Sequence, residues 1–450
     1  MEREIQDDTR RSLSRGLLTV VNMDFEETLD WLYGFQKFGI KLGLERINHI
    51  TEELGDPQKK YKLIHVGGTN GKGSVCKFLE SVLSSSGYNV GVYTSPHLQH
   101  ISERLIVGNN RITDDELILL VNKIKPIVDG MLEKENAPTF FEVFTALAFQ
   151  YFSDKNVDFA VVEVGLGGRY DATNIVDPAI SIITNVSLEH QNILGKNIED
   201  ITFEKAGIIK NNVPVITASK DSALKIIEKI AKEKNAPMSA IGEKNWKRIN
   251  SYINNQEFLI NGFLKDYSVR TSMMGRHQGE NIALALAAIE KLQMDGAYIT
   301  DTSIIEGIEK TVNPGRMEIV SYEPIVLLDG AHNKAGMQTL VDTLKNDFEY
   351  DRLIVVLGIL SDKDVGSMIS MIIPLTAFFV TTKSNNARAC DPNELKKIIE
   401  KQGYKNEVVV KEHVPDALEY SKSIAKKKDL ICVTGSLFTV GEARDYLSIK

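Results

Sequence analysis

Residues 65–74 read His-Val-Gly-Gly-Thr-Asn-Gly-Lys-Gly-Ser, and this stretch decides the fold around it. The apolar run Leu63–Val66 precedes it, and apolar residues follow it at helical spacings of three and four. A strand, a glycine-rich loop and a helix in this order form a phosphate-binding turn. Backbone N–H groups and the helix N-terminus face the anion, and Lys72 adds a positive charge. The stretch therefore predicts binding of a nucleoside triphosphate.

The loop differs from the usual Walker A pattern, in which Gly-Lys is followed directly by Ser or Thr. Here Gly73 follows Lys72, and the hydroxyl comes one residue later, at Ser74. The difference disfavours a G-protein or a motor ATPase, and it leaves open what the nucleotide is used for.

Length and composition narrow the class of protein. A chain of 450 residues predicts two or three domains, and 43% hydrophobic with 25% charged residues is typical of a soluble globular protein. A net charge of −8 argues against a nucleic-acid partner. No apolar run approaches the roughly 18 residues of a membrane span, so we expect no membrane partner. The three cysteines lack metal-ligand spacing, which favours a reduced, cytoplasmic protein. As a separate expectation, we predict a monomer.

Strand-like apolar runs alternate with helical patterns along most of the chain, which predicts parallel sheets covered on both faces. The expected fold is α/β. A P-loop nucleotide-binding domain has a mostly parallel sheet plus a small antiparallel section near 250–274, and a smaller doubly wound, Rossmann-like domain follows. The predicted divisions are an N-terminal extension (1–22), an ATP-binding domain (23–300), a hinge linker (301–316) and a C-terminal domain (317–450). The predicted strands are Lys62–Val66, Val90–Thr94, Phe159–Val164, Ile180–Asn185, Val213–Thr217, Ile325–Asp329, Leu353–Gly358, Phe378–Thr381, Val408–Val410 and Leu430–Thr434.

Polar clusters follow several strands, at the edge where open α/β sheets bind ligands. In the first domain, Gly165–Asn174 and Ser187–Gln191 follow strands, and Glu142 lies among aromatic residues. A carboxylate in such surroundings needs a partner or a metal. Ser74, Glu142 and His190 form a candidate set for Mg²⁺, which prefers oxygen ligands and nucleotide phosphates; a structural role for each stays open. In the second domain, Asp329–Asn333, Gly358–Asp364 and Thr434–Leu437 follow strands and predict one ligand-facing edge.

These motifs resemble those of folylpolyglutamate synthase/dihydrofolate synthase, within the Mur-ligase superfamily of ATP-dependent amide-forming ligases. The resemblance runs from about Met23 to the end of the chain. It rests on the segments Gly68–Ser74, Thr94–Leu98, Glu163–Arg169, Glu204–Ile208, Asp329–Asn333 and Thr434–Ser436, in the family's order and approximate spacing. The displaced hydroxyl of Ser74 is a feature of this family.

The resemblance implies roles for individual residues. The ATP site would comprise Gly68, Thr69, Asn70, Gly71, Lys72, Gly73, Ser74, Asn281, Arg316 and Asp329. Two Mg²⁺ ions would be held by Ser74, Glu142, His190 and a carbamate on Lys205. His332, with Lys72 and Lys205, would lie near the reacting groups. The folate or dihydropteroate side would include Ser95, Pro96, His97 and Arg104, and Ser436 would contact L-glutamate.

The implied reaction joins L-glutamate to the γ-carboxyl of a folate, or to dihydropteroate, through an acyl phosphate made from ATP. Two alternatives remain open: another Mur-type ligase acting on a different pterin or a cell-wall precursor, and a P-loop ATPase regulator. Two departures from the family are visible. Glu189 stands where many relatives have Asp, and the N-terminal extension has no counterpart.

Overall fold

The computed structural model describes residues 23–133 and 136–448, so the predicted N-terminal extension lies outside the described residues. The chain forms two compact units. One comprises the chain up to Lys60 together with Ile112–Lys155, and the other comprises Tyr61–Arg111 and Asn156–Lys450. These boundaries differ from the predicted ones, because Ile112–Lys155, which stands between strands of the first sheet in the sequence, groups with the N-terminal helices.

The first unit is helical. Its α-helices and 3₁₀ helices are α2 (Phe25–Tyr33), η1 (Gly34–Phe38), α3 (Glu45–Glu53), η2 (Pro57–Lys59), α5 (Asp114–Glu133) and α6 (Phe140–Asp154). Side-chain capping fixes two of the helix starts, since Asp24 and Thr139 each accept a hydrogen bond from the N–H three residues later. Helix α6 is buried along nearly its whole length and packs against α3 and α5.

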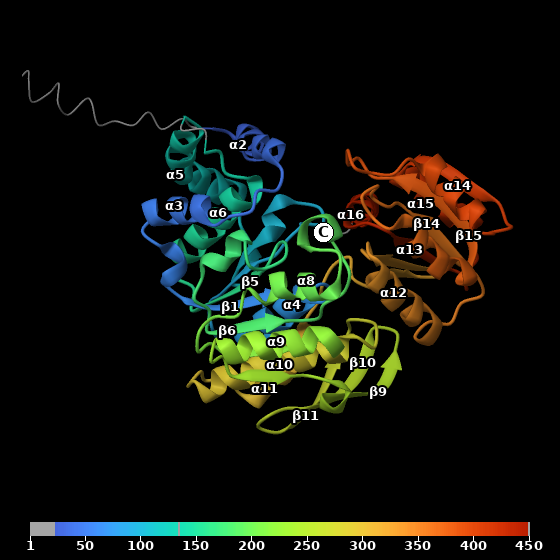
Figure 1. Ribbon diagram of the computed structural model, residues 1–450. Helices are drawn as coiled ribbons and strands as arrows, with labels where there is room; N and C mark the ends of the chain where they lie inside the picture. The colour runs from blue at the N-terminus through green and yellow to red at the C-terminus, as the bar shows by residue number, and fades with distance from the viewer. Residues whose placement is uncertain (1–22, 134–135, 449–450) are drawn as a thin grey trace, which may run out of the picture. The chain divides into compact units, whose positions relative to one another are not determined.

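The second unit begins with an eight-stranded sheet in the order β4-β3-β2-β5-β1-β6-β7-β8. Its central strands β5, β1 and β6 are labelled in Figure 1. Strands β2, β5, β1, β6, β7 and β8 are parallel, and β3 and β4 add an antiparallel edge. The buried strands form because they are short, continuous apolar runs. The bounds are β1 Lys62–Gly67, β2 Val90–Tyr93, β3 Leu105–Val107, β4 Asn110–Arg111, β5 Phe159–Glu163, β6 Ile180–Ile183, β7 Val215–Thr217 and β8 Met238–Ala240.

Helices and short 3₁₀ turns connect these strands. They are α4 (Lys72–Ser85), η3 (Ile101–Arg104), η4 (Ala172–Ile175), α7 (Gln191–Leu194), α8 (Ile198–Ala206), α9 (Asp221–Glu233) and η5 (Glu243–Asn245). Strand β1 lies between β5 and β6, so the glycine-rich loop after it leaves the middle of the sheet. This is where α/β sheets bind their ligands.

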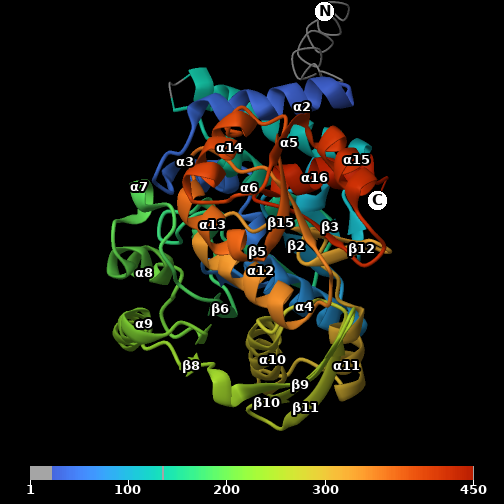
Figure 2. The same cartoon turned by 90° about the vertical axis from the view of Figure 1, so that its right-hand side faces the viewer.

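The predicted antiparallel section is confirmed as a three-stranded sheet of β9 (Trp246–Tyr252), β10 (Asn255–Asn261) and β11 (Asp266–Thr271). Figure 2 shows it beside α10 (Gln278–Met294) and α11 (Asp301–Lys310). Helix α11 lies within the predicted linker 301–316. Residues 301–310 pack on α4, with Gly307 so close to Val82 that a Cβ would lie 2.5 Å from its Cα. Only 311–316 remain as a connecting segment.

The C-terminal part is a doubly wound α/β domain with the strand order β12-β13-β17-β14-β15-β16, in which only β12 is antiparallel. Apolar residues on both faces of this sheet form its two cores. The strands are β12 Glu318–Tyr322, β13 Ile325–Asp329, β14 Leu353–Leu357, β15 Thr376–Lys383, β16 Val408–His413 and β17 Leu430–Thr434. The helices are α12 Lys334–Asn346, α13 Val365–Ile372, η6 Ile373–Leu375, α14 Pro392–Lys401, α15 Val414–Ile424 and α16 Leu437–Tyr446.

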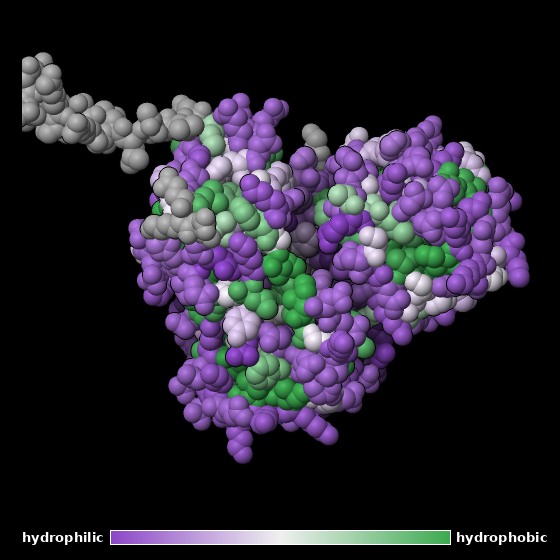
Figure 3. Space-filling view, turned by 45° about the horizontal axis from the view of Figure 1, so that its top comes forward, coloured by the Kyte–Doolittle hydropathy of each residue, from purple (hydrophilic) through white to green (hydrophobic). Residues whose placement is uncertain are grey.

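The face seen in Figure 3 is mostly hydrophilic, with apolar side chains in small groups. Within the described residues, no helix combines the length and hydropathy needed to cross a bilayer.

Candidate active site

A cavity of about 530 Å³ lies at the carboxyl ends of strands from both parallel sheets of the second unit. The first sheet contributes the loops after β1, β2, β5 and β6, and the C-terminal sheet contributes those after β13, β14, β15 and β17. Polar residues dominate these loops. Sixteen of the predicted site residues line the cavity: Gly68, Thr69, Asn70, Gly71, Lys72, Gly73, Ser74, Ser95, Pro96, His190, Lys205, Asn281, Arg316, Asp329, His332 and Ser436.

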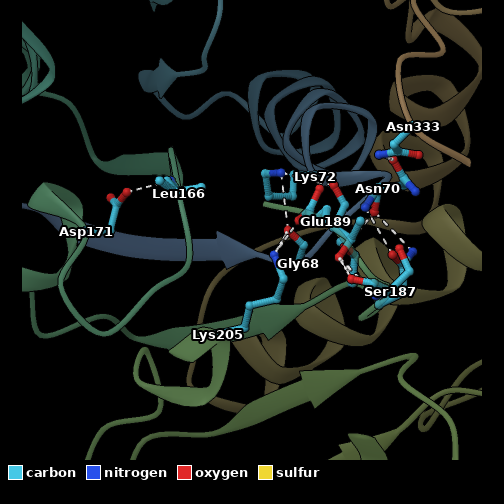
Figure 4. Close-up of polar contacts among 12 residues, drawn as sticks. Gly68, Asn70, Lys72, Leu166, Asp171, Ser187, Glu189, Lys205 and Asn333 are labelled. Carbon is cyan, nitrogen blue, oxygen red and sulfur yellow. Dashed lines mark hydrogen bonds and ion pairs between the residues drawn. The ribbon is translucent and has the colours of Figure 1, made fainter. Parts of the chain in front are cut away.

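The glycine-rich loop has the form expected of a phosphate-binding turn. Gly71 precedes α4 with a φ of 85°, which suits glycine, and it gives the helix no side-chain cap. The N–H groups of the first helical turn therefore point toward the cavity, as at other anion-binding helix N-termini. The loop is held from behind, because Asn70 accepts hydrogen bonds from Thr184, Asn185 and Asn333 (Figure 4).

The lysine and the displaced hydroxyl of the loop have specific neighbours. Lys72 donates hydrogen bonds to the carbonyls of Gly68 and Thr69, and its Nζ lies 3.9 Å from Glu163 Oε1. The Ser74 hydroxyl accepts a hydrogen bond of 3.2 Å from Asn313, which lies in the connecting segment. A Cβ at Gly73 would lie 3.9 Å from both Glu163 and Asn313, so both side chains are close to the loop.

Glu163 is a functional candidate that the sequence reasoning missed, although it opens the motif Glu163–Arg169. It is the last residue of β5 and lines the cavity. Burial raises its pKa, while Lys72 and the N–H of Ser95 act in the opposite direction. The available signal was its position, since a carboxylate at the carboxyl end of an otherwise apolar parallel strand faces the ligand edge.

Lys205 and Glu189 form a buried ion pair beneath the loop. Lys205 Nζ donates to Glu189 Oε1 at 2.7 Å and to the carbonyl of Gly68 at 2.9 Å (Figure 4). Burial alone would raise the pKa of Glu189, but the positive charges of Lys205 and Lys72 lower it to about 2. Burial lowers the pKa of Lys205. The side chain of Glu189 is 11% exposed and is long enough to make this contact with the lysine.

Two histidines lie at the cavity. His190 follows β6 with a φ of 45°, and burial lowers its pKa. His332 follows β13, and its Nδ1 lies 2.7 Å from the carbonyl oxygen of Gly330. Because a carbonyl only accepts, Nδ1 carries the proton and Nε2 is left as an acceptor. Burial and the charge of Arg316 lower the pKa of His332 to about 4, so the ring is neutral at pH 7.

Arg316 and Asp329 connect the segment between the domains with the C-terminal sheet. Arg316 donates to the carbonyl of Gly330, and Asp329 accepts hydrogen bonds from the N–H groups of Met317 and Ala331. Burial raises the pKa of Asp329, and Arg316 opposes this. Asp329 thereby fixes the start of the C-terminal domain while its carboxylate remains on the cavity wall.

At the start of α10, Asn281 donates to Gln278 at 2.9 Å and is 4% exposed. His277 next to it lines the same cavity, and its buried Nδ1 has no hydrogen-bond partner in the described chain. The sequence reasoning named Asn281 and missed His277.

The predicted folate loop is only partly at the cavity. Ser95 and Pro96 line it. His97 and Arg104 do not, because Arg104 donates a hydrogen bond of 2.9 Å to His97 Nδ1 and both side chains are turned into the loop. Burial beside Arg104 lowers the pKa of His97 to about 3.

Glu142 belongs to the first unit, where its carboxylate already has partners. It accepts hydrogen bonds from Arg46 and from the backbone and hydroxyl of Thr139, as part of the α6 capping box. These contacts account for its burial without a metal ion. Its assignment as a Mg²⁺ ligand stays a prediction, and Glu163 is the carboxylate that lies beside the loop containing Ser74.

The residues at the cavity fit Mg²⁺ bound together with a nucleotide. No three acidic, histidine or cysteine side chains of the described chain lie close enough to hold a metal by themselves. Ser74, Glu163, Glu189 and His190 nevertheless line the cavity. Mg²⁺ is commonly bound by one or two carboxylates, with water and substrate phosphates completing its coordination.

Comparison with known proteins agrees with this architecture. Residues 66–289 match the Mur ligase middle domain, and residues 315–437 match the Mur ligase glutamate ligase domain. A Bacillus subtilis protein named dihydrofolate synthase/folylpolyglutamate synthase is 36% identical, over 94% of this chain and 99% of the relative.

Two solved structures are similar over almost the whole chain. Folylpolyglutamate synthase of Thermotoga maritima is 37% identical with a TM-score of 0.82, covering 94% of this chain and 97% of that one. Folylpolyglutamate synthase of Mycobacterium tuberculosis, complexed with ADP and AMPPCP, is 30% identical with a TM-score of 0.88, covering 95% and 100%. The ligand edges of both sheets line one cavity with the phosphate loop, and the sequence and structure resemble these proteins over nearly their whole length. The chain therefore belongs to the dihydrofolate synthase/folylpolyglutamate synthase family of the Mur ligases.

Proposed function

We propose that this protein is an ATP-dependent ligase that adds L-glutamate to the γ-carboxyl of a reduced folate, and that it also accepts dihydropteroate. The observation that carries the proposal is that a phosphate-binding loop and the ligand edge of the glutamate-ligase domain line one cavity. The relatives' names, which join the two synthase activities, support both acceptors.

The reaction requires activation, because oxide is a poor leaving group from a carboxylate. An oxygen of the substrate carboxylate attacks the γ-phosphorus of ATP and ADP leaves, which gives an acyl phosphate. The glutamate nitrogen then attacks the acyl carbon, phosphate leaves and the nitrogen loses a proton. A closed cavity protects the acyl phosphate from water.

The chain's own residues suit these steps. Lys72, the first-turn N–H groups of α4 and Arg316 would offset the negative charges of the triphosphate and the carboxylates. His332 is neutral, and its Nε2 would accept a hydrogen bond from the incoming amine. Bound Mg²⁺ would supply further charge neutralisation at the phosphates, with Ser74, Glu163 and His190 as its protein ligands.

We further propose that Lys205 becomes a carbamate when Mg²⁺ is bound. Burial lowers the pKa of Lys205, which increases the share of the amine form that reacts with CO₂. The reaction forms an N–C bond and releases one proton. Because the product is an anion next to Glu189, it requires a cation between the two groups. Protein incubated with ¹³C-bicarbonate should give a carbamate NMR signal only with Mg²⁺, and a signal also seen in a Lys205→Arg variant would contradict the assignment.

The function is tested by measuring ADP release with Mg²⁺-ATP, L-glutamate and either tetrahydrofolate or dihydropteroate, with mass analysis of the products. We expect ADP formation that requires both co-substrates and a product one glutamyl residue heavier. ADP release that ignores glutamate and the pterin would refute the ligase and favour an ATPase regulator. If the protein uses tetrahydrofolate but not dihydropteroate, the proposed activity with dihydropteroate is refuted.

A further inference from the structure

The loop between β2 and β3, residues 94–104, packs against helix α16 of the C-terminal domain. Two of its first residues, Ser95 and Pro96, line the cavity. Beyond them, the carbonyl oxygen of Leu98 lies so near α16 that a Cβ at Gly441 would be 2.1 Å from it. A Cβ at Gly315 would be 3.0 Å from the Leu98 side chain. Contacts this close require glycine at both positions, so this acceptor loop is seated on a surface that is shaped for it.

Gln99 joins the acceptor loop to α16 by two hydrogen bonds. Its amide oxygen accepts one of 2.9 Å from Arg444 Nε, and its amide nitrogen donates one of 2.7 Å to Asp445 Oδ1. The arginine only donates and the carboxylate only accepts, so a single orientation of the amide satisfies both partners. The pair of hydrogen bonds therefore specifies the position of Gln99 on the helix.

Arg444 connects this contact with the segment that leads to the phosphate loop. The arginine is 2% exposed, and besides Gln99 it pairs with Glu318 of β12. The other carboxylate oxygen of Glu318 accepts a hydrogen bond of 2.7 Å from the N–H of Gly315. In the same connecting segment, Asn313 donates to the phosphate loop. One buried guanidinium thus links the acceptor loop to the segment beside the nucleotide site.

The acceptor loop moves as a unit, because its own hydrogen bonds fix its shape. Glu103 accepts hydrogen bonds from the N–H groups of Leu98, Gln99 and His100. Helix α16, on which the loop rests, begins after Ser436, and Ser436 lines the cavity. The helix therefore has the cavity at its N-terminal end and the contact with the acceptor loop near its C-terminal end.

We propose that Arg444 is a positioning residue for the acceptor substrate, which deepens the proposed function and rests on it. Acting through Gln99, it holds the acceptor loop so that Ser95 and Pro96 stand at the cavity wall where the folate binds. Arg444 is not among the described residues that line the cavity, so it acts on the reaction only through its neighbours. Loss of its contact with Gln99 should weaken binding of the folate and spare that of ATP.

The test is steady-state kinetics of the wild type, Gln99→Ala and Arg444→Gln, each with varied tetrahydrofolate, ATP and L-glutamate. We expect the KM for tetrahydrofolate to rise about tenfold in both variants, the loss typical of one charge-assisted hydrogen bond. In Gln99→Ala, the KM values for ATP and glutamate should change less than twofold. Gln99→Glu keeps an acceptor for Arg444 and should restore part of the affinity for tetrahydrofolate.

The double variant, Gln99→Ala with Arg444→Gln, tests whether Arg444 acts through Gln99. Because both single changes remove the same hydrogen bond, the double variant should have nearly the same KM for tetrahydrofolate as either single variant. Effects that multiply to about a hundredfold would overturn the inference, since Arg444 would then act by another route. An unchanged KM for tetrahydrofolate in Gln99→Ala, or an equal rise in its KM for ATP, would also overturn it.

Arg352→Gln is the matched control. Arg352 pairs with Asp429 in the same domain, and neither residue is among the described residues that line the cavity. The KM for tetrahydrofolate should be unchanged in this variant. A rise equal to that in Arg444→Gln would show that general loosening of the domain is the cause, and it would overturn the inference.

Amide hydrogen exchange measures the contact without any substrate. Gln99→Ala should speed exchange in the acceptor loop, and Arg352→Gln should not. Unchanged exchange in Gln99→Ala would show that Arg444 does not hold the loop. If the wild type releases ADP without a folate, the proposed function fails, and the exchange data still decide whether Arg444 positions the loop.

Discussion

Removal of the Lys205 side-chain charge should destabilise the second unit. The ion pair between Lys205 and Glu189 sets the expected decrease in the free energy of unfolding. Replacing Lys205 with Met leaves Glu189, whose side chain is 11% exposed, without its hydrogen-bonded cation. The pKa of Glu189 is lowered from 4.5 to about 2, which corresponds to about 3 kcal/mol. Lys72 contributes to this value, and the cost of burying Lys205 offsets part of it. We therefore expect the free energy of unfolding to fall by about 2 kcal/mol at pH 7.

A double-mutant cycle separates the ion pair from the other contacts of each residue. Lys205→Met and Glu189→Gln are each measured alone, and the double variant should be more stable than the sum of the two losses by about 2 kcal/mol. The assay is urea unfolding without Mg²⁺ or bicarbonate, followed by Trp246 fluorescence in a Trp31→Phe background. Trp246 is in the second unit and Trp31 is in the first, and the chain has 2 tryptophans.

The pH dependence gives a second measure of the same pair. Because folding lowers the pKa of Glu189, its stabilising contribution is complete above about pH 4.5 and is lost as the pH falls toward 2. The difference between wild type and Lys205→Met should therefore shrink as the pH is lowered below that value. A coupling energy under about 0.5 kcal/mol at pH 7 would refute the reasoning, since surface pairs reach that value without burial.

Two further predictions concern glycines. Gly71→Ala should weaken ADP binding at least tenfold in calorimetry, because its φ is positive and a Cβ would lie 2.5 Å from Asn281 Oδ1. Gly296→Ala also has a positive φ but open space, so it should lower stability by about 1 kcal/mol and leave ADP binding unchanged. Gly307→Ala should lower stability by about 2 kcal/mol, because α11 must move from α4. Gly130→Ala, in α5 with nothing within 4 Å, should instead be neutral or stabilising in thermal unfolding.

The parallel strands were predictable from the sequence because each buried strand is a continuous apolar run bounded by polar residues. Ile325–Asp329 and Leu430–Thr434 have the predicted bounds. The short edge strands β3, β4 and β8 were not predicted, because two or three residues carry no detectable periodicity. The unit formed by the N-terminal helices and 112–155 also escaped prediction, since strand and helix patterns do not report which inserted helices pack together.

Residues of the site were predictable where a motif follows a strand, as for Lys72, Asp329 and Ser436. Contacts between distant segments were not. The sequence indicates that Glu142 needs a partner, but it does not indicate that Arg46 is that partner. Likewise, Lys363 and Arg388 line one cavity only because β14 and β15 are neighbours in the sheet.

The hydrogen bonds from Asn313 to Ser74 and from Asn333 to Asn70 have a consequence for synthesis of the protein. They join the phosphate loop to segments that the ribosome makes 239 and 263 residues later. The nucleotide cavity is therefore incomplete until Phe438, the last lining residue of the described chain, has left the ribosome. A nascent or truncated chain has the phosphate loop without the rest of its walls, so it is not expected to spend cellular ATP.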